Sequence, residues 1–269
     1  MSPMELTEGS LAGQPTLSWG AGPPVVALPG LSARNANPRG MERTTQTDGL
    51  QAVAERFTVH LLQRRPGLPA GTTMSDLAAD VADAIAELGG GPVPVVGIST
   101  GGSLALQLAV DHPGVVSRLV VGCGAMRLSD PGRARQEALA ELTRAGRPRA
   151  AWAQLAPALA ASLPGRAVMW SLLWLGGGPQ GDDAADLLAT VAAEDAYDVG
   201  PRLGEVTAPT LVFIGGRDGF YGAQLAHDTA RAIPDGHLLL YPRGSHMTTL
   251  GHRSAQRAIA HFLAGEEWR

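Results

Sequence analysis

Six short apolar runs are distributed along the chain, and none of them alternates with polar residues. They are PVVALPG (24–30), FTVHLL (57–62), VPVVGI (93–98), SRLVVGC (117–123), PTLVFIGG (209–216) and HLLLYP (237–242). Unbroken runs of this length are typical of strands that are buried on both faces, as in a parallel sheet covered by helices. We therefore expect these segments to form the strands of one sheet.

Segments with helical periodicity separate the runs. In residues 74–88, apolar positions recur at spacings of four, four and three, at Leu77, Val81, Ile85 and Leu88. Thr73 with Asp76 supplies a start signal, and the glycines at 89–91 supply a stop. Further helices are expected over 103–112, 222–232 and 251–264. Strands and helices thus alternate, which predicts an α/β fold with a mostly parallel central sheet flanked by helices.

One segment breaks this alternation. Residues 127–203 carry helix-like patterns but no convincing strand, and they are too long for a simple crossover between two strands. We interpret them as a helical cap inserted into the sheet domain. The core domain is then expected over residues 1–126 and 204–269, with the cap contributing much of the substrate specificity.

Composition narrows the possible functions. The 269 residues are 45% hydrophobic and 17% charged, with a formal net charge of −4, which argues against a nucleic-acid surface. All 21 cationic residues are Arg. The absence of Lys excludes Schiff-base chemistry, a Ser-Lys dyad and a phosphate-binding loop of the GKS type.

The cysteine content and the apolar profile predict a location. Cys123 is the single cysteine, so no intramolecular disulfide can form and nothing indicates an oxidising compartment. The first residues lack the pattern of a secretory signal, and no apolar stretch is long enough to span a bilayer. We expect a cytoplasmic protein without a membrane partner.

The first candidate catalytic motif is Gly97-Ile98-Ser99-Thr100-Gly101, which matches G-x-S-x-G. The motif lies between an apolar run and a helical pattern. Glycines flank such a serine because a strand that turns abruptly into a helix leaves no room for side chains. The turn also places Ser99 beside a helix N-terminus, where free N–H groups favour negative charge. Ser99 is therefore a candidate nucleophile.

A serine nucleophile needs a base and an orienting acid. His246 follows the apolar run at 237–242 in a predicted loop, and His252 is its near rival among the seven histidines. Asp218 directly follows the run at 209–216. After the run at 117–123, the first carboxylate is Asp130, which is too far along the chain. His246 and Asp218 are thus the candidate base and acid.

This order of Ser99, Asp218 and His246, each after a buried strand, resembles the α/β-hydrolase superfamily. The resemblance extends over nearly the whole chain and implies a Ser-Asp-His triad. It also implies an oxyanion hole made by the backbone N–H groups of Leu31 and Thr100. In that loop Pro29 stands where relatives commonly have His. No metal or organic cofactor is implied.

The resemblance implies a serine hydrolase that cleaves an ester, thioester or lactone of an apolar small molecule through an acyl-enzyme. Two alternatives stay open. The same triad can hydrolyse a carbon–carbon bond or serve a cyclisation, and some relatives of this fold bind small molecules without catalysis. Cap-to-core packing or contact with an apolar substrate accounts for three tryptophans, Trp152, Trp170 and Trp174. The oligomeric state is left open.

Overall fold

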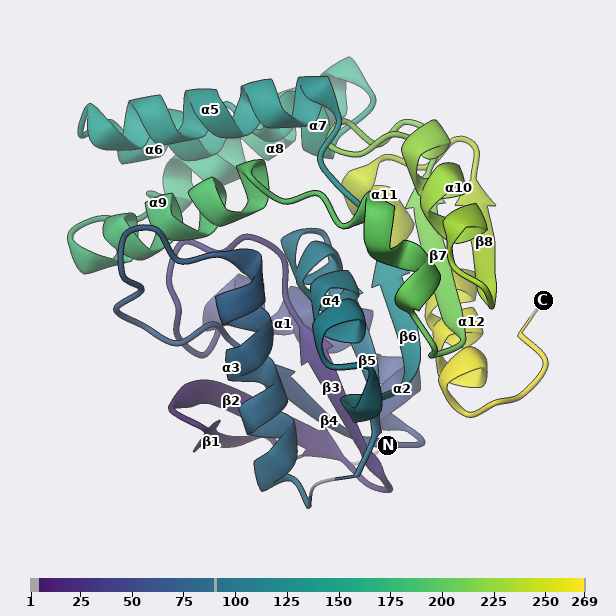
Figure 1. Ribbon diagram of the computed structural model, residues 1–269. Helices are drawn as coiled ribbons and strands as arrows, with labels where there is room; N and C mark the ends of the chain where they lie inside the picture. Colours follow the sequence, from purple (N-terminus) through teal and green to yellow (C-terminus); the bar gives the residue numbers. More distant parts are fainter. Residues whose placement is uncertain (1–4, 90, 269) are drawn as a thin grey trace.

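The computed structural model describes residues 5–89 and 91–268 and contains one eight-stranded sheet (Figure 1). Residues 1–4, 90 and 269 lie outside the described residues. Residues 1–4 and 269 are the two ends of the expected core domain. Residue 90 is the middle one of the three glycines at 89–91 that are expected to end the preceding helix. The strand order is β1-β2-β4-β3-β5-β6-β7-β8.

All six predicted strands are confirmed. They are β3 (Pro24–Leu28), β4 (Thr58–Leu62), β5 (Val93–Ile98), β6 (Val116–Gly122), β7 (Thr210–Gly215) and β8 (Gly236–Tyr241). They pair in parallel throughout. Their carboxyl ends therefore meet at one edge of the sheet, where ligand sites form in open α/β folds.

The strands read as continuous apolar runs because both faces of the sheet are covered. Alternate strand residues belong to two separate core clusters: Val26 and Val95 face one cluster, whereas Val25 and Val96 face the other. On the first face lie α3 (Met74–Glu87), α4 (Thr100–Asp111) and α10 (Ala223–Ala232). The second face is covered by α2 (Gln51–Ala54) and α12 (Arg253–Leu263), and α1 (Gly40–Gly49), which buries no residue, contacts α2.

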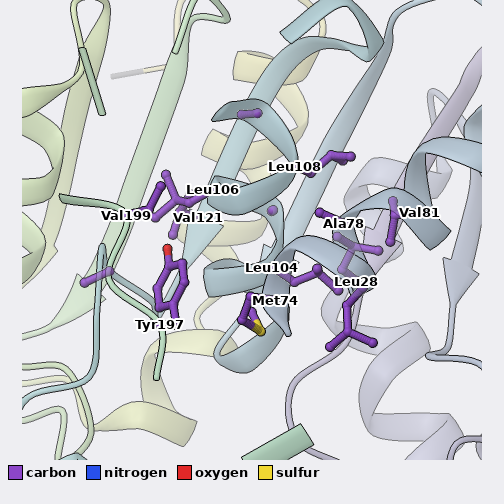
Figure 2. Packing of buried hydrophobic residues seen from close by; sticks show 14 of the residues in the cluster. Leu28, Met74, Ala78, Val81, Leu104, Leu106, Leu108, Val121, Tyr197 and Val199 are labelled. Carbon is purple, nitrogen blue, oxygen red and sulfur yellow. The ribbon is translucent and has the colours of Figure 1, made fainter. Parts of the chain in front are cut away.

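Helix α3 begins as its sequence predicts, with a reciprocal capping box between Thr73 and Asp76. Figure 2 shows part of the cluster that this helix helps to form, with Leu104 and Leu108 of α4 among Ala78 and Val81 of α3. Helix α4 extends further toward the N-terminus than expected and starts at Thr100. The residue after the candidate nucleophile is thus already helical.

Two further strands were not predicted. β1 (Thr7–Leu11) and β2 (Gln14–Gly20) form an antiparallel hairpin that adds to β4 at one edge. Ala12 and Gly13 both have positive φ in the two-residue turn, which matches the twist of a hairpin. β1 is exposed and polar, and β2 buries polar Gln14 and Thr16. Neither strand therefore presents an apolar run.

Between β6 and β7 the described chain forms helices and no strand. They are α5 (Asp130–Arg144), α6 (Pro148–Ala153), α7 (Ala156–Leu159), α8 (Leu163–Gly176) and α9 (Asp182–Asp195), followed by the 3-10 helix η2 (Gly200–Glu205). Figure 1 shows α5 to α9 gathered together beside the sheet. An isolated bridge joins Arg127 to Asp198, so the segment leaves and rejoins the core at neighbouring points. The division into core and cap stays a proposal.

None of the helices across the described residues combines the length and the apolar character needed to cross a membrane. The location of the protein in the cell stays a prediction.

Helix α9 ends with two adjacent acidic residues, Glu194 and Asp195. The Oδ1 atom of Asp195 is buried and has no hydrogen-bond partner among the described residues. The pKa of Asp195 is raised from 3.8 to about 6, first because burial disfavours the charged form and second because of the neighbouring Glu194 charge. Asp195 is therefore a group that destabilises the fold when it ionises.

We predict a stability decline with rising pH that depends on Asp195. Because its pKa is higher in the folded protein than in the unfolded chain, the folded state binds more protons between about pH 4 and about pH 6, and the free energy of unfolding falls as the pH rises through this window. Asp195→Asn should match the wild type at about pH 4 and exceed it in stability at about pH 7. Urea denaturation at both pH values measures this. The same difference at both would contradict the assignment.

Candidate active site

Ser99 lies at the turn from β5 into α4 with φ +55° and ψ −124°. A non-glycine residue in this region of φ and ψ is strained by about 1–3 kcal/mol, and such strain persists only where the surroundings enforce it. Here the Ser99 N–H donates to the carbonyl of Gly122 at 2.7 Å, and the Ser99 carbonyl accepts from the N–H of Gly102 at 2.6 Å. The turn is thus held on both sides.

The glycines of the motif are required by close approach. A Cβ at Gly97 would lie 2.2 Å from the carbonyl oxygen of Gly101, and a Cβ at Gly101 would lie 2.1 Å from the carbonyl oxygen of Leu28. Gly30 faces the nucleophile, since its Cβ would lie 3.1 Å from the Cβ of Ser99. The loop after β3 therefore passes directly beside Ser99.

Two backbone donors are free beside this serine. The N–H groups of Leu31 and Thr100 donate to no other group within residues 5–89 and 91–268. Thr100 is the first residue of α4, where helical N–H groups lack partners and the helix dipole favours negative charge. Because Gly30 packs against Ser99, Leu31 lies in the loop beside it. The two predicted oxyanion donors are thus unsatisfied groups next to Ser99.

Arg64 holds this loop and was not found from the sequence. It follows β4 and is only 4% exposed. Its guanidinium donates to the carbonyls of Pro29 (3.3 Å) and Gly30 (2.9 Å) and to Ser32 Oγ (3.2 Å). Burial lowers the pKa of Arg64 to about 10. Its position after the end of a buried strand was the signal that could have revealed it.

His246 and Asp218 are brought together. Their Nδ1 and Oδ2 atoms are 2.7 Å apart, with side chains 4% and 0% exposed. The other oxygen of Asp218 accepts from the N–H groups of Phe220 and Tyr221. Burial acts to raise the pKa of Asp218, but the His246 charge and these hydrogen bonds together hold it below its ordinary value. An ionised Asp218 fixes the proton on Nδ1 and leaves Nε2 as an acceptor.

His246 lies in a short helix and not in the loop that the sequence predicts. It is the first residue of α11 (His246–Leu250), which begins at a capping box between Ser245 and Thr248. This capping box fixes the backbone from which the imidazole of His246 projects. The rival His252 precedes α12, is exposed, and hydrogen-bonds to Ser254. His246 is therefore the histidine that the fold presents to a buried acid.

The end of β6 connects the serine to this pair. Gly122 accepts the hydrogen bond from the Ser99 N–H, and the thiol of the next residue, Cys123, donates to the His246 carbonyl over 3.6 Å. Ser99 Oγ makes no hydrogen bond to His246 or to another described residue. Such bonds are often long until substrate binds. These contacts thus connect Ser99 and His246, and Asp218 through His246, to the end of β6.

Cys123 lies beneath the pair, fully buried and with φ +47°. Its sulfur and ligand-type atoms of Asp218 and His246 lie within 4.8 Å of one another, a spacing compatible with a metal ion. Burial and the Asp218 charge raise the pKa of the thiol well above its usual value. A protonated thiol is a poor metal ligand, and Asp218 already accepts three N–H bonds. Support of the Asp-His pair is the role that fits these atoms.

The structure separates the three tryptophans. Trp152 is half-buried and packs against the main core cluster. Trp170 and Trp174 stack on α8 with ring centroids 5.0 Å apart, and Trp170 is 46% exposed. α8 packs on α7. α7 in turn lies against the acid turn, residues 216–221, which carry Asp218, since a Cβ at Gly219 would lie 2.5 Å from Ala158 Cα. The stacked pair thus lies on the helix that packs on α7.

The fold and this geometry define the class of protein. The model of the alpha/beta hydrolase family matches residues 25–261, from the second residue of β3 into α12. The match spans all the parallel strands and every predicted site residue. The chain belongs to the alpha/beta hydrolase family and is an enzyme of that family.

Several known proteins similar to the chain are named as hydrolases. A pimeloyl-(acyl-carrier protein) methyl ester esterase of Chromobacterium violaceum is 28% identical over 256 residues, covering 91% of this chain and 95% of the relative. A protein of Serratia proteamaculans named for carbamate hydrolysis, RutD, is 28% identical over 207 residues, 73% of this chain and 77% of its own. The enol-lactonase structure from Burkholderia xenovorans LB400 superposes with a TM-score of 0.77 at 18% identity, covering 96% of this chain and 100% of the other. The last shows the fold alone.

The close approach at Gly101 gives a testable prediction. Gly101→Ala should lower the free energy of unfolding by about 1–3 kcal/mol, because the new methyl group meets the backbone of Leu28. Urea denaturation measures this change. Gly114→Ala is the matched control, since a Cβ there has no atom within 4 Å. Equal stability of the two variants would show that the turn can relax.

Proposed function

We propose that the protein is a serine hydrolase that cleaves an ester, thioester or lactone of an apolar small molecule through an acyl-enzyme on Ser99. The strained placement of Ser99 beside two free N–H groups, at the strand end that also contacts His246, is the observation that carries this proposal. The named esterase among the similar proteins supports the ester class.

The chemistry follows from the groups in place. His246 Nε2 takes the Ser99 proton as Oγ bonds to the carbonyl carbon, and the N–H groups of Leu31 and Thr100 stabilise the resulting oxyanion. The imidazolium, stabilised by Asp218, then gives the proton to the leaving group as the acyl-enzyme forms. Water, deprotonated by His246, releases the acid. No step needs a cofactor.

Residues 127–203 are proposed as the cap over this site. Gly219 packs against Ala158 of α7, so this segment closes over the acid turn. The stacked Trp170 and Trp174 supply an apolar surface on α8, the next helix. We propose that they contact the apolar part of a substrate. Trp152 is half-buried against the main core cluster, and its contact with substrate stays a prediction.

Loss of the nucleophile is the first test. Ser99→Ala should lower turnover of short p-nitrophenyl esters by at least about 10³-fold, because members of a catalytic unit act together. A fluorophosphonate probe should label the wild type and fail on Ser99→Ala, as read by intact mass. His246→Ala should lose turnover similarly while keeping its far-UV circular dichroism.

Other outcomes separate the alternatives. Folded wild type that is neither labelled nor active on esters, thioesters and lactones, but binds apolar ligands, would favour a binding protein. Diketone cleavage that depends on Ser99, without ester turnover, would favour a carbon–carbon hydrolase. Retained ester turnover in Ser99→Ala would refute the proposal.

Chain-length preference tests the tryptophan pair. Trp174→Ala should raise the KM for long-chain p-nitrophenyl esters about 10-fold while leaving acetate turnover nearly unchanged, because an aromatic wall contributes apolar contact area. Leu163→Ala is the control, since Leu163 is on the same helix, 77% exposed, and outside the stack. A uniform change for all esters would argue against a substrate wall.

A further inference from the structure

Glu194 is a fully buried carboxylate in α9 that points to the core domain. Its relative exposure is 0%. It accepts four hydrogen bonds, from Thr100 Oγ1 (2.9 Å), Ser103 Oγ (2.9 Å), Gln136 Nε2 (2.7 Å) and Tyr221 OH (2.7 Å). No donor among them carries a formal charge. A buried carboxylate is retained at such a cost only when its oxygens are fully satisfied, as here.

Three of these donors belong to the elements of the site, and the fourth, Gln136, is on α5. Thr100 follows Ser99 and carries one of the two free N–H groups, and Ser103 is one turn later in α4. Tyr221 belongs to the acid turn, where its N–H donates to Asp218 at 3.1 Å. One carboxylate outside the core domain therefore fixes both the first turn of the nucleophile helix and the turn that carries the acid.

Glu194 also acts, through Arg64, on the loop that carries Leu31, the other oxyanion donor. Burial weakens the charged form of Arg64, and the negative charge of Glu194 is the largest influence that opposes this effect. Arg64 in turn holds the carbonyls of Pro29 and Gly30. The negative charge of Glu194 thus favours the buried cation that holds the loop with Leu31, and hydrogen bonds to Thr100 and Tyr221 are its direct links to the site.

We propose that Glu194 is a positioning residue. While α9 is packed in place, Glu194 holds the oxyanion hole and the acid turn in alignment with each other. This inference rests on the proposed function, since it assigns Leu31 and Thr100 as donors to the oxyanion. Glu194 touches neither substrate nor the reacting atoms. Through Thr100 and Tyr221 it sets where the donors and the acid are held.

Asp186 provides a matched control on the same helix. It is also buried, at 4% exposure, and accepts two hydrogen bonds from the core, from the N–H groups of Gly67 and Leu68. Neither of those residues belongs to the triad, the oxyanion loop or α4. Loss of Asp186 should therefore weaken the attachment of α9 without breaking a hydrogen bond to the site. Because the charge of Asp186, like that of Glu194, favours the Arg64 cation, this variant also controls for the loss of a negative charge near Arg64.

The experiment compares ester kinetics in Glu194→Ala, Glu194→Gln and Asp186→Ala. Glu194→Ala should lower kcat at least about 10-fold, with KM changed less than about 3-fold, because the oxyanion is stabilised only in the transition state. Glu194→Gln should recover most of kcat, since an amide oxygen can accept from Thr100 and Gln136 while its NH₂ donates to the two other hydroxyls. Asp186→Ala should be less stable yet keep kcat within about 3-fold.

A second variant keeps the test valid if Glu194→Ala fails to fold. Thr100→Val replaces only the hydroxyl by a methyl group of similar size and should lower kcat and the rate of fluorophosphonate labelling together. Where Glu194→Ala folds, Thr100→Val should add little to its loss, because both changes break the same hydrogen bond.

Several results would overturn the proposal. They are wild-type kcat in Glu194→Ala or in Thr100→Val, an equal loss in Glu194→Gln and Glu194→Ala, or an equal loss in Glu194→Ala and Asp186→Ala. Failure of the proposed function looks different, since the wild type itself would then show no turnover or labelling that depends on Ser99.

Discussion

The positive φ of Ser99 is the constraint on which the site depends. A serine enters this conformation only if the strand before it and the helix after it are both fixed, and parallel pairing of β5 and packing of α4 supply that fixation. The same turn leaves the N–H of Thr100 without an intrahelical partner. Strain, a free donor and a helix N-terminus are thus produced by one change of chain direction.

The remaining groups are added by the neighbouring strand ends. β3 delivers Gly30 and Leu31, β4 delivers Arg64, β6 delivers Cys123, and the segments after β7 and β8 deliver Asp218 and His246. Only the sheet edge brings residues so distant in sequence together. Burial strengthens each hydrogen bond between these groups. Because a buried polar group without a partner would lower the stability of the fold, the side chains are restrained to the positions in which they are paired. The helices after β6 contribute by packing and, in our proposal, through Glu194.

The sequence predicted the elements whose pattern is dominated by burial. The six parallel strands were found because both of their faces are apolar, and Ser99, Asp218 and His246 were found because each follows such a strand. The β1–β2 hairpin was missed because an edge strand needs no apolar run. Glu194 was missed because a charged residue gives no local sign of burial. Arg64 was missed because its one signal, a position after the end of a buried strand, does not show that the side chain itself is buried. The short helix that starts at His246 depends on a cap, Ser245 with Thr248, inside a segment that reads as a loop.

A crystal structure of the phosphonylated protein is the sharpest test of this site. Phosphorus should be bonded to Ser99 Oγ, with one phosphonyl oxygen about 2.7–3.1 Å from the N–H groups of both Leu31 and Thr100. His246 Nε2 should lie within hydrogen-bond reach of the serine oxygen or the leaving-group position. Phosphorus on another residue, or an oxygen directed away from both N–H groups, would contradict this assignment of the site.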